Sequence, residues 1–181
     1  MPRGPMGATR PLSSNLRSMA NGLTVARALL GLPLILALAA GWSQLGWWLL
    51  LLGGLSDAAD GWLARRAGGG SPWGARLDPL SDKLLMASPL LWLAAHGVLP
   101  LWAVWLLLAR ELLVSGWRAG AQAGGPASLA GKTKTALQFS SVLLLLWPWE
   151  YGEWAKMIGW WLFWPSLAVA LSSAWGYVRQ R

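Results

Sequence analysis

The chain has 181 residues, of which 55% are hydrophobic and only 12% are charged. Soluble proteins carry roughly a quarter charged residues, so this composition excludes an ordinary soluble domain and indicates a membrane protein. The sequence has no cysteine and one histidine, which excludes disulfides and thiolate metal sites and argues against a zinc centre. The net charge of +8 would suggest nucleic-acid binding in a soluble protein, but membrane topology accounts for it, and we expect no nucleic-acid partner.

Six apolar runs predict six transmembrane helices in an all-α, polytopic fold. A helix that crosses a bilayer needs about 20 mostly apolar residues, and Gly, Pro, charged or short polar stretches separate the runs. The break between the third and fourth runs depends mainly on His96, Gly97 and Pro100. We therefore expect one six-helix transmembrane domain over residues 21–181, with spans that begin near Leu23, Leu45, Leu84, Leu99, Ala136 and Trp154.

The positions of Lys and Arg predict which ends of the spans face the cytoplasm. Basic residues precede the first span and follow the second, fourth and sixth spans, whereas the loops near 41–44, 96–100 and 150–153 carry none. Both termini should therefore be cytoplasmic. Residues 1–20, with Arg scattered among Gly, Pro and Ser, predict a disordered cytoplasmic tail and not a signal peptide. The Trp-rich, Lys-poor composition suggests a GC-rich bacterial genome and hence a bacterial inner membrane.

The sixteen tryptophans are expected to anchor the helices at the membrane surfaces, because Trp prefers the interface between lipid and water. Most of them lie near predicted span ends, among them Trp42, Trp47, Trp102, Trp149 and Trp175. A pigment-binding or ligand-binding role is the less favoured alternative.

Four of the seven acidic residues, Asp57, Asp60, Asp78 and Asp82, cluster directly after the second apolar run. A carboxylate in or beside a bilayer is energetically costly, so it is by default a candidate functional group. A Gly-rich loop between Arg66 and Pro72 predicts an antiparallel pair of helices whose acidic faces can meet. Helical spacing gives two such faces, one with Asp57, Asp60, Gly61 and Ala64, and one with Gly74, Asp78 and Asp82.

The two acidic faces predict a metal site made of oxygen ligands. Four neighbouring carboxylates would repel one another unless cations lay among them, and such ligands suit Mg²⁺ or Mn²⁺. Two ions roughly 3.5 to 4 Å apart stabilise both the attacking and the leaving oxygen in phosphoryl transfer, so two ions are expected here. The small residues on the same faces leave space for a polar substrate. The alternative is that the acids are solvated loop residues paired with Arg65, Arg66, Arg76 and Lys83.

From Asp57 to Asp82 the chain has the pattern Asp-x2-Asp-Gly-x2-Ala-Arg-x8-Gly-x3-Asp-x3-Asp. This pattern resembles that of the CDP-alcohol phosphatidyltransferase family. The resemblance implies a metal-dependent membrane enzyme in which all four aspartates bind metal and Asp82 is also the general base. It implies that the donor nucleotide is bound by the residues Asp57, Asp60, Gly61, Ala64, Arg65 and Gly74.

A polar triplet near the start of the first span, Asn21, Thr24 and Arg27, is similar to the corresponding stretch of the same family. These residues are spaced three apart and so share a helical face. The resemblance implies that they lie near the donor. A helix cap with polar interface anchors is an equally good alternative.

A second polar cluster lies on the fourth span, in the string ARELLVSGWR, and at the start of the fifth, in GKTKTALQ. Basic groups close to a metal site predict a pocket for an anion on the acceptor, because Arg binds phosphate through two bonds and Lys through a point charge. The candidate phosphate-binding residues are Arg110, Arg118, Lys132 and Lys134. Alternatively, Arg110 and Glu111 form a buried ion pair and the lysines contact lipid head groups.

Both strings resemble those of phosphatidylglycerophosphate synthases, which implies transfer of a phosphatidyl group from CDP-diacylglycerol to sn-glycerol 3-phosphate in phospholipid biosynthesis, with release of CMP. Related activities with phosphatidylglycerol, an inositol phosphate or serine as acceptor are the alternatives. An ion transporter is a remote alternative, because the acids cluster on one side and no transporter repeat is present. Membrane lipids are expected partners, and dimers are common in the resembled family.

Overall fold

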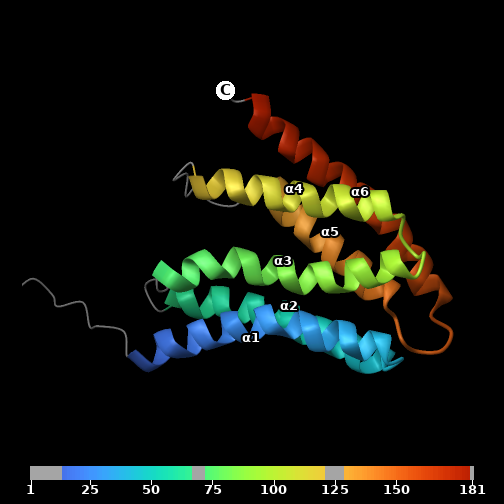
Figure 1. The fold of residues 1–181 in the computed structure, drawn as a ribbon, viewed down its shortest axis with the longest axis horizontal. Coiled ribbons are helices and arrows are strands. Elements are labelled where there is room, and N and C mark those ends of the chain that lie inside the picture. Colours follow the sequence, from blue (N-terminus) through green and yellow to red (C-terminus); the bar gives the residue numbers. More distant parts are fainter. Residues whose placement is uncertain (1–13, 67–71, 121–128, 180–181) are drawn as a thin grey trace, which may run out of the picture.

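The computed structural model describes residues 14–66, 72–120 and 129–179, and within these ranges the chain is helical apart from short turns. No strand is found among the described residues, so the predicted all-α fold with six helices is confirmed. The helices are α1 (Ser14–Ala39), α2 (Ser43–Arg66), α3 (Pro72–Ala95), α4 (Leu101–Gly120), α5 (Leu129–Leu145) and α6 (Glu153–Arg179) (Figure 1).

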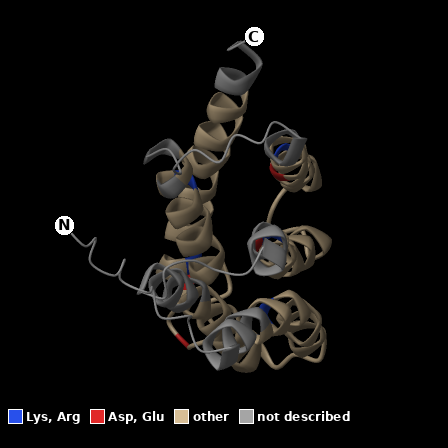
Figure 2. Ribbon diagram, turned by 90° about the vertical axis from the view of Figure 1, so that its left-hand side faces the viewer, with Lys and Arg blue, Asp and Glu red and all other residues tan. Residues whose placement is uncertain are grey.

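Successive helices run in opposite directions, so the connections fall at two ends of the bundle (Figure 1). The last residues of α2 and α4 and the first residues of α3 and α5 lie at one end, here named the carboxylate end because α2 carries Asp57 and Asp60 close to it. Helix α1 packs against α2 and α3, α5 packs against α6, and α4 contacts α3 and α6. Viewed onto the carboxylate end, the described helices carry few charged positions (Figure 2).

Helix α1 begins earlier than predicted. Residues 14–20 were expected to belong to a disordered tail, but they form the first turns of α1. The segment contains no proline or glycine before Gly22, so nothing in it stops the helix from extending back toward Ser14, and Ser is a favoured residue at a helix start. Residues 1–13 of the predicted tail lie outside the described residues.

Glycines with positive φ end helices α1 and α3. Gly41 has φ 79° and Gly97 has φ 70°, a conformation that residues with a Cβ rarely adopt. After Gly97, the Val98 N–H donates to the Leu93 carbonyl at 2.9 Å, which satisfies one of the last free carbonyls of α3. The predicted break between the third and fourth spans is therefore confirmed at this turn.

Helices α5 and α6 approach most closely at Gly159. A Cβ at this position would lie 2.8 Å from both the Leu145 nitrogen and the Ser141 carbonyl oxygen. The buried Ser141 hydroxyl also donates to the Gly159 carbonyl at 2.6 Å. Small residues at such crossings let two backbones pack closely where lipid offers no hydrophobic driving force.

Tryptophan rings gather at the end opposite the carboxylate end. The Trp47 ring lies 4.8 Å from that of Trp149 and 5.9 Å from that of Trp147, centroid to centroid, in edge-to-face arrangements. The Trp47 indole donates to the Leu143 carbonyl at 2.9 Å and so links α2 to α5. These rings contribute to helix packing, and their predicted interfacial role stays a prediction.

One segment in the described ranges, Glu153–Ala174, is long and apolar enough to cross a membrane by length and composition, and Thr24–Ala39 is a shorter apolar segment. The helices α2 to α5 each include Asp, Glu, Lys or Arg, which lowers their hydropathy over a full membrane thickness. The number of helices is thus confirmed, while the number that spans the membrane stays a prediction.

Arg27 joins α1 to α2 and α3. Its Nε donates to Ser56 Oγ at 3.2 Å, and its guanidinium donates to Asp82 Oδ1 at 3.0 Å. The Arg27 side chain is fully buried, whereas the Asp82 side chain is 43% exposed. Because a buried charge is tolerated only with a partner, this ion pair fixes the relative positions of the three helices near the carboxylate end.

Gly159→Ala is expected to lower the melting temperature, because the added Cβ forces α5 and α6 apart. Overpacking of this kind costs about 1–3 kcal/mol, and each kcal/mol corresponds to a shift of about 2–4 °C for a chain of this size. Intrinsic tryptophan fluorescence in detergent measures the shift. Gly116→Ala is the matched control, because a Cβ there meets nothing within 4 Å. Equal melting temperatures for the two variants would contradict the close approach.

Arg27→Met is also expected to lower the melting temperature, because it leaves Asp82 without this counter-charge. Breaking a buried ion pair costs roughly 3–5 kcal/mol, and the partial exposure of Asp82 places the expected loss below that range. Arg27→Lys should be intermediate, since one ammonium cannot reproduce the planar fork. Lys156→Met, which breaks the exposed pair with Glu153, is the control. An Arg27→Met protein as stable as the control would disprove the structural role of Arg27.

Candidate active site

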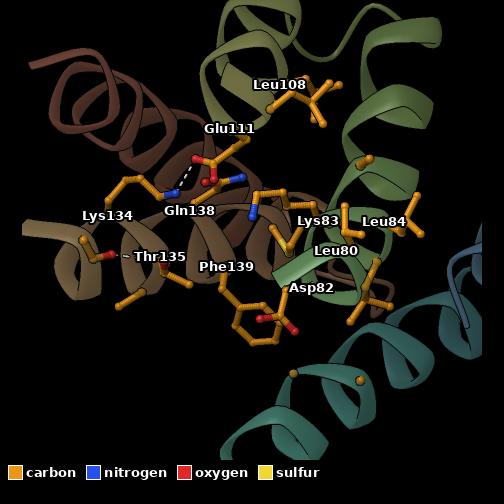
Figure 3. Close-up of a pocket in the computed structure, with 18 residues that line it drawn as sticks. Leu80, Asp82, Lys83, Leu84, Leu108, Glu111, Lys134, Thr135, Gln138 and Phe139 are labelled. Atoms are coloured by element: carbon orange, nitrogen blue, oxygen red, sulfur yellow. Dashed lines mark hydrogen bonds and ion pairs between the residues drawn. The ribbon is translucent and has the colours of Figure 1, made fainter. Parts of the chain in front are cut away.

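A cavity of about 760 Å³ lies between α2, α3, α4 and α5, in the half of the bundle nearer the carboxylate end (Figure 3). Much of its wall is apolar, with Leu80, Leu84, Leu85, Met86, Leu108, Leu112 and Phe139. Its polar groups are Asp82, Lys83, Glu111, Lys134, Thr135 and Gln138. The cavity therefore combines charged groups of both signs with an apolar surface.

Asp82 is the candidate catalytic residue on the α3 wall. Its carboxylate is held by Arg27 yet remains 43% exposed at the cavity. A carboxylate that is both oriented and accessible can accept a hydrogen bond or a proton from a group bound in the cavity. Asp82 thus has an accessible position on the cavity wall, while its predicted role as general base is not tested by this geometry.

Glu111 is the centre of an ion-pair cluster on the opposite wall. Lys134 donates to Glu111 Oε1, and the Arg110 guanidinium donates to the same oxygen at 3.0 Å. The Lys134, Arg110 and Glu111 side chains are only 8%, 10% and 14% exposed. Arg110 also donates to the Ala170 carbonyl at 2.9 Å and to Ser173 Oγ at 2.5 Å. The cluster thus connects α4, α5 and α6.

The four predicted phosphate-binding residues are placed differently. Lys134 lines the cavity, whereas Arg110 is not among the lining residues. The buried Arg110–Glu111 ion pair, which the sequence left open as an alternative, is present. The side chains of Arg118 and Lys132 lie outside the described residues. Binding of an acceptor phosphate therefore stays a prediction for all four.

Lys83 lies between the two charged walls. It is close enough to Glu111, Lys134 and Asp82 to interact with each of them electrostatically. Figure 3 shows its side chain extending from α3 into the same space as Glu111. From the sequence, Lys83 is one of the basic residues around the loop after the second span and a candidate partner for the acids; its place on the cavity wall is seen only in the tertiary structure.

The other three aspartates of the predicted metal site belong to helices α2 and α3. Asp57 and Asp60 belong to the last turns of α2, and Asp78 belongs to the first turns of α3. Their side chains lie outside the described residues, as do those of Asn21, Gly61, Ala64, Arg65 and Gly74. Among the side chains that are described, no group of three or more His, Asp or Glu could hold a metal ion. The predicted two-metal site stays a prediction.

Thr24 is buried on the α1 side of Asp82. It lines a second cavity of about 320 Å³ with Ala28, Leu29, Ser81 and Leu84, between α1 and α3. Thr24 and Arg27 share the inward face of α1, as their spacing predicted. The donor-binding role of Thr24 stays a prediction.

Two contacts were missed by the sequence analysis: Arg27 as the partner of Asp82, and Glu111 as the partner of Lys134. A signal for both exists in the sequence, because each is a charged residue within or beside an apolar helix and so requires a partner inside the bundle. The identity of the partner could not be found, since each pair joins different helices.

Residues 17–172 match the family described as CDP-alcohol phosphatidyltransferase. A probable phosphatidylglycerophosphate synthase of Mycobacterium tuberculosis is 34% identical, over 75% of this chain and 68% of its own length. A cardiolipin synthase (CMP-forming) of Streptomyces coelicolor is 34% identical, over 88% of this chain and 86% of its own length. A CDP-diacylglycerol–glycerol-3-phosphate 3-phosphatidyltransferase of Bacillus subtilis is 36% identical, over 54% and 52% respectively.

The family match extends over both walls of the cavity. It includes Arg27 and Asp82 on one side and Glu111 and Lys134 on the other, together with the aspartate pattern between α2 and α3. The resemblance first noted in 26 residues therefore holds for most of the chain. The chain belongs to the CDP-alcohol phosphatidyltransferase family of enzymes.

Proposed function

We propose that the protein transfers a phosphatidyl group from CDP-diacylglycerol to sn-glycerol 3-phosphate, forming phosphatidylglycerophosphate and releasing CMP. The main support is the cavity, which has Asp82 on the α3 wall, the amino group of Lys134 on the opposite wall and Lys83 between them (Figure 3). Basic groups beside the candidate base suit an acceptor that carries both a hydroxyl and a phosphate. The names of the Mycobacterium and Bacillus relatives agree with this acceptor.

The protein works as a multi-pass membrane protein whose six helices all cross the bilayer, with the carboxylate end at the cytoplasmic face of a bacterial inner membrane. Large apolar side chains on the outer surface support this topology, for example Leu113, which is 74% exposed, and Trp161, which is 65% exposed. An outer surface of this kind is unfavourable in water and favourable in lipid. The basic residues after α2 and α4 agree with the same orientation.

Asp57, Asp60, Asp78 and Asp82 would hold two Mg²⁺ or Mn²⁺ ions. The helical ends of α2 and α3 carry these acids, and an oxygen-only ligand set suits such ions. Bound ions would offset the negative charge of the donor diphosphate and of the departing CMP. The donor nucleotide would contact the small and basic residues of the same segments, Gly61, Ala64, Arg65 and Gly74. Asn21 and Thr24 would lie near the donor.

Asp82 acts as the general base in this proposal. Its carboxylate accepts the proton of the acceptor hydroxyl while that oxygen forms a bond to the phosphorus that carries diacylglycerol. The bond from this phosphorus to the CMP oxygen breaks, and CMP leaves. Arg27 keeps the Asp82 carboxylate oriented toward the cavity throughout.

Lys134 provides the main contact to the acceptor phosphate, together with Lys132 and Arg118. Arg110 does not contact the phosphate directly, because each of its three guanidinium nitrogens already donates to Ala170, Ser173 or Glu111. Its positive charge acts on the phosphate only at a distance. A phosphate held at Lys134 would lie across the cavity from Asp82, which leaves the acceptor hydroxyl free to reach the base.

Phosphatidylglycerol is the second candidate acceptor, supported by the similarity to the Streptomyces cardiolipin synthase over most of both chains. Purified protein with labelled CDP-diacylglycerol and Mn²⁺ is expected to release CMP with sn-glycerol 3-phosphate, and not with phosphatidylglycerol, serine or an inositol phosphate. Chelation of the metal with EDTA should stop the reaction. Turnover with phosphatidylglycerol alone would refute the proposed acceptor.

Asp82→Asn is expected to lower CMP release by at least about 100-fold, since general-base catalysis contributes roughly 10²–10⁴-fold. Binding of CDP-diacylglycerol should persist, at least weakly, because the other three acids remain. Glu150→Gln, the same change of carboxylate to amide at an exposed turn, is the matched control. Unchanged CMP release from a folded Asp82→Asn protein would show that Asp82 is not the base.

A further inference from the structure

Glu111 is bonded to Lys134, the residue that the proposed function assigns to the acceptor phosphate. Its Oε1 atom accepts a hydrogen bond from Lys134, which lines the cavity, and one from Arg110, which does not. Glu111 itself lines the cavity and is 14% exposed. An anion that approaches Lys134 therefore meets a carboxylate already bound to it.

The two partners of Glu111 differ in how firmly they are held. Arg110 is fixed to α6 by its bonds to the Ala170 carbonyl and to Ser173 Oγ. Lys134 is attached only through its flexible side chain near the start of α5, and within the described residues its side chain bonds to Glu111. Glu111 can lose the contact to Lys134 and still have its charge compensated by Arg110, which is its neighbour in sequence.

We propose that Glu111 is a resident counter-ion that competes with the acceptor phosphate for Lys134. In the site without substrate, Glu111 pairs with both Lys134 and Arg110. When the phosphate binds Lys134, Glu111 pairs with Arg110 alone. A buried ammonium without a partner is strongly unfavourable, so the empty cavity needs such an anion. The inference rests on the proposed function, because it takes Lys134 as the phosphate-binding residue.

The exchange keeps a negative partner beside Lys134 in both states. Without substrate, the single Glu111 carboxylate is shared by Lys134 and Arg110, so these three groups carry a net charge of +1. With substrate, the phosphate pairs with Lys134, and Lys83 stands close enough to add a second positive charge. The contact that Glu111 makes before binding therefore lowers the affinity for the acceptor, and Glu111 is a positioning residue that acts through Lys134.

Glu111→Gln removes the competing charge while keeping the size of the side chain. We expect it to tighten the binding of sn-glycerol 3-phosphate about tenfold, because the phosphate no longer displaces a charged hydrogen-bond partner. Isothermal titration calorimetry with sn-glycerol 3-phosphate on the full chain in detergent measures the dissociation constant. The KM for this acceptor at saturating CDP-diacylglycerol should fall by a similar factor. Glu153→Gln, the same change in an exposed Glu–Lys pair, should leave both constants unchanged.

Two further variants separate competition from a structural role. In a Lys134→Gln background, the tightening produced by Glu111→Gln should disappear. Glu111→Asp, whose shorter carboxylate reaches Lys134 less well, should tighten binding by a smaller factor than Glu111→Gln, and it remains informative if Glu111→Gln does not fold. If Glu111 had only a structural role, Glu111→Gln and Glu111→Asp would each weaken the binding of sn-glycerol 3-phosphate instead.

Weaker or unchanged binding in Glu111→Gln, or tightening that persists without Lys134, would overturn the inference. A wild-type protein that fails to bind or use sn-glycerol 3-phosphate, yet turns over another alcohol, would overturn the proposed function instead. The two failures are therefore distinguishable.

Discussion

The buried guanidinium of Arg27 is the constraint on which the rest of the site depends. A fully buried cation requires a partner, and within the described residues Asp82, which lines the cavity from α3, is an ion-pair partner. A second bond from Arg27 to Ser56 adds α2 to the same junction. Arg27 therefore joins α1, α2 and α3 at one side chain, beside the segments of α2 and α3 that carry the four aspartates. The buried charge of Arg27 thus positions the carboxylate of Asp82.

The same rule of charge compensation shapes the opposite wall. Glu111 lies between Arg110 and Lys134, and Arg110 is fixed in turn to α6. Each wall of the cavity therefore carries a compensated cluster: Arg27 with Asp82 on one side, and the Glu111 cluster on the other. In a membrane, where an unpaired charge is expensive, such clusters allow ionic chemistry in a bundle whose surroundings are apolar.

Much of the fold follows from local features of the sequence. Glycines 41 and 97 end helices where the apolar runs break, because their positive φ values suit a helix end. The start of α1 was predicted too late, since only composition marked the tail, and no breaker separates Ser14 from the apolar run. Asp57, Asp60 and Asp78 lie in helices α2 and α3, as the aspartate spacing required, while the faces on which their side chains lie stay a prediction. Asp82, from the same pattern, lines the cavity.

By itself, the sequence determined the helical fold, the segments that carry charge and the family pattern from Asp57 to Asp82, because each of these is encoded in neighbouring residues. Only the tertiary structure decided which charges meet. Arg27 and Asp82 are 55 residues apart, and Glu111 and Lys134 are 23 apart. Several basic residues could have paired with each acid, and helical spacing does not distinguish among partners on other helices. Packing of the bundle selects the pairs, since a buried charge must bond with whichever group the neighbouring helix brings within reach.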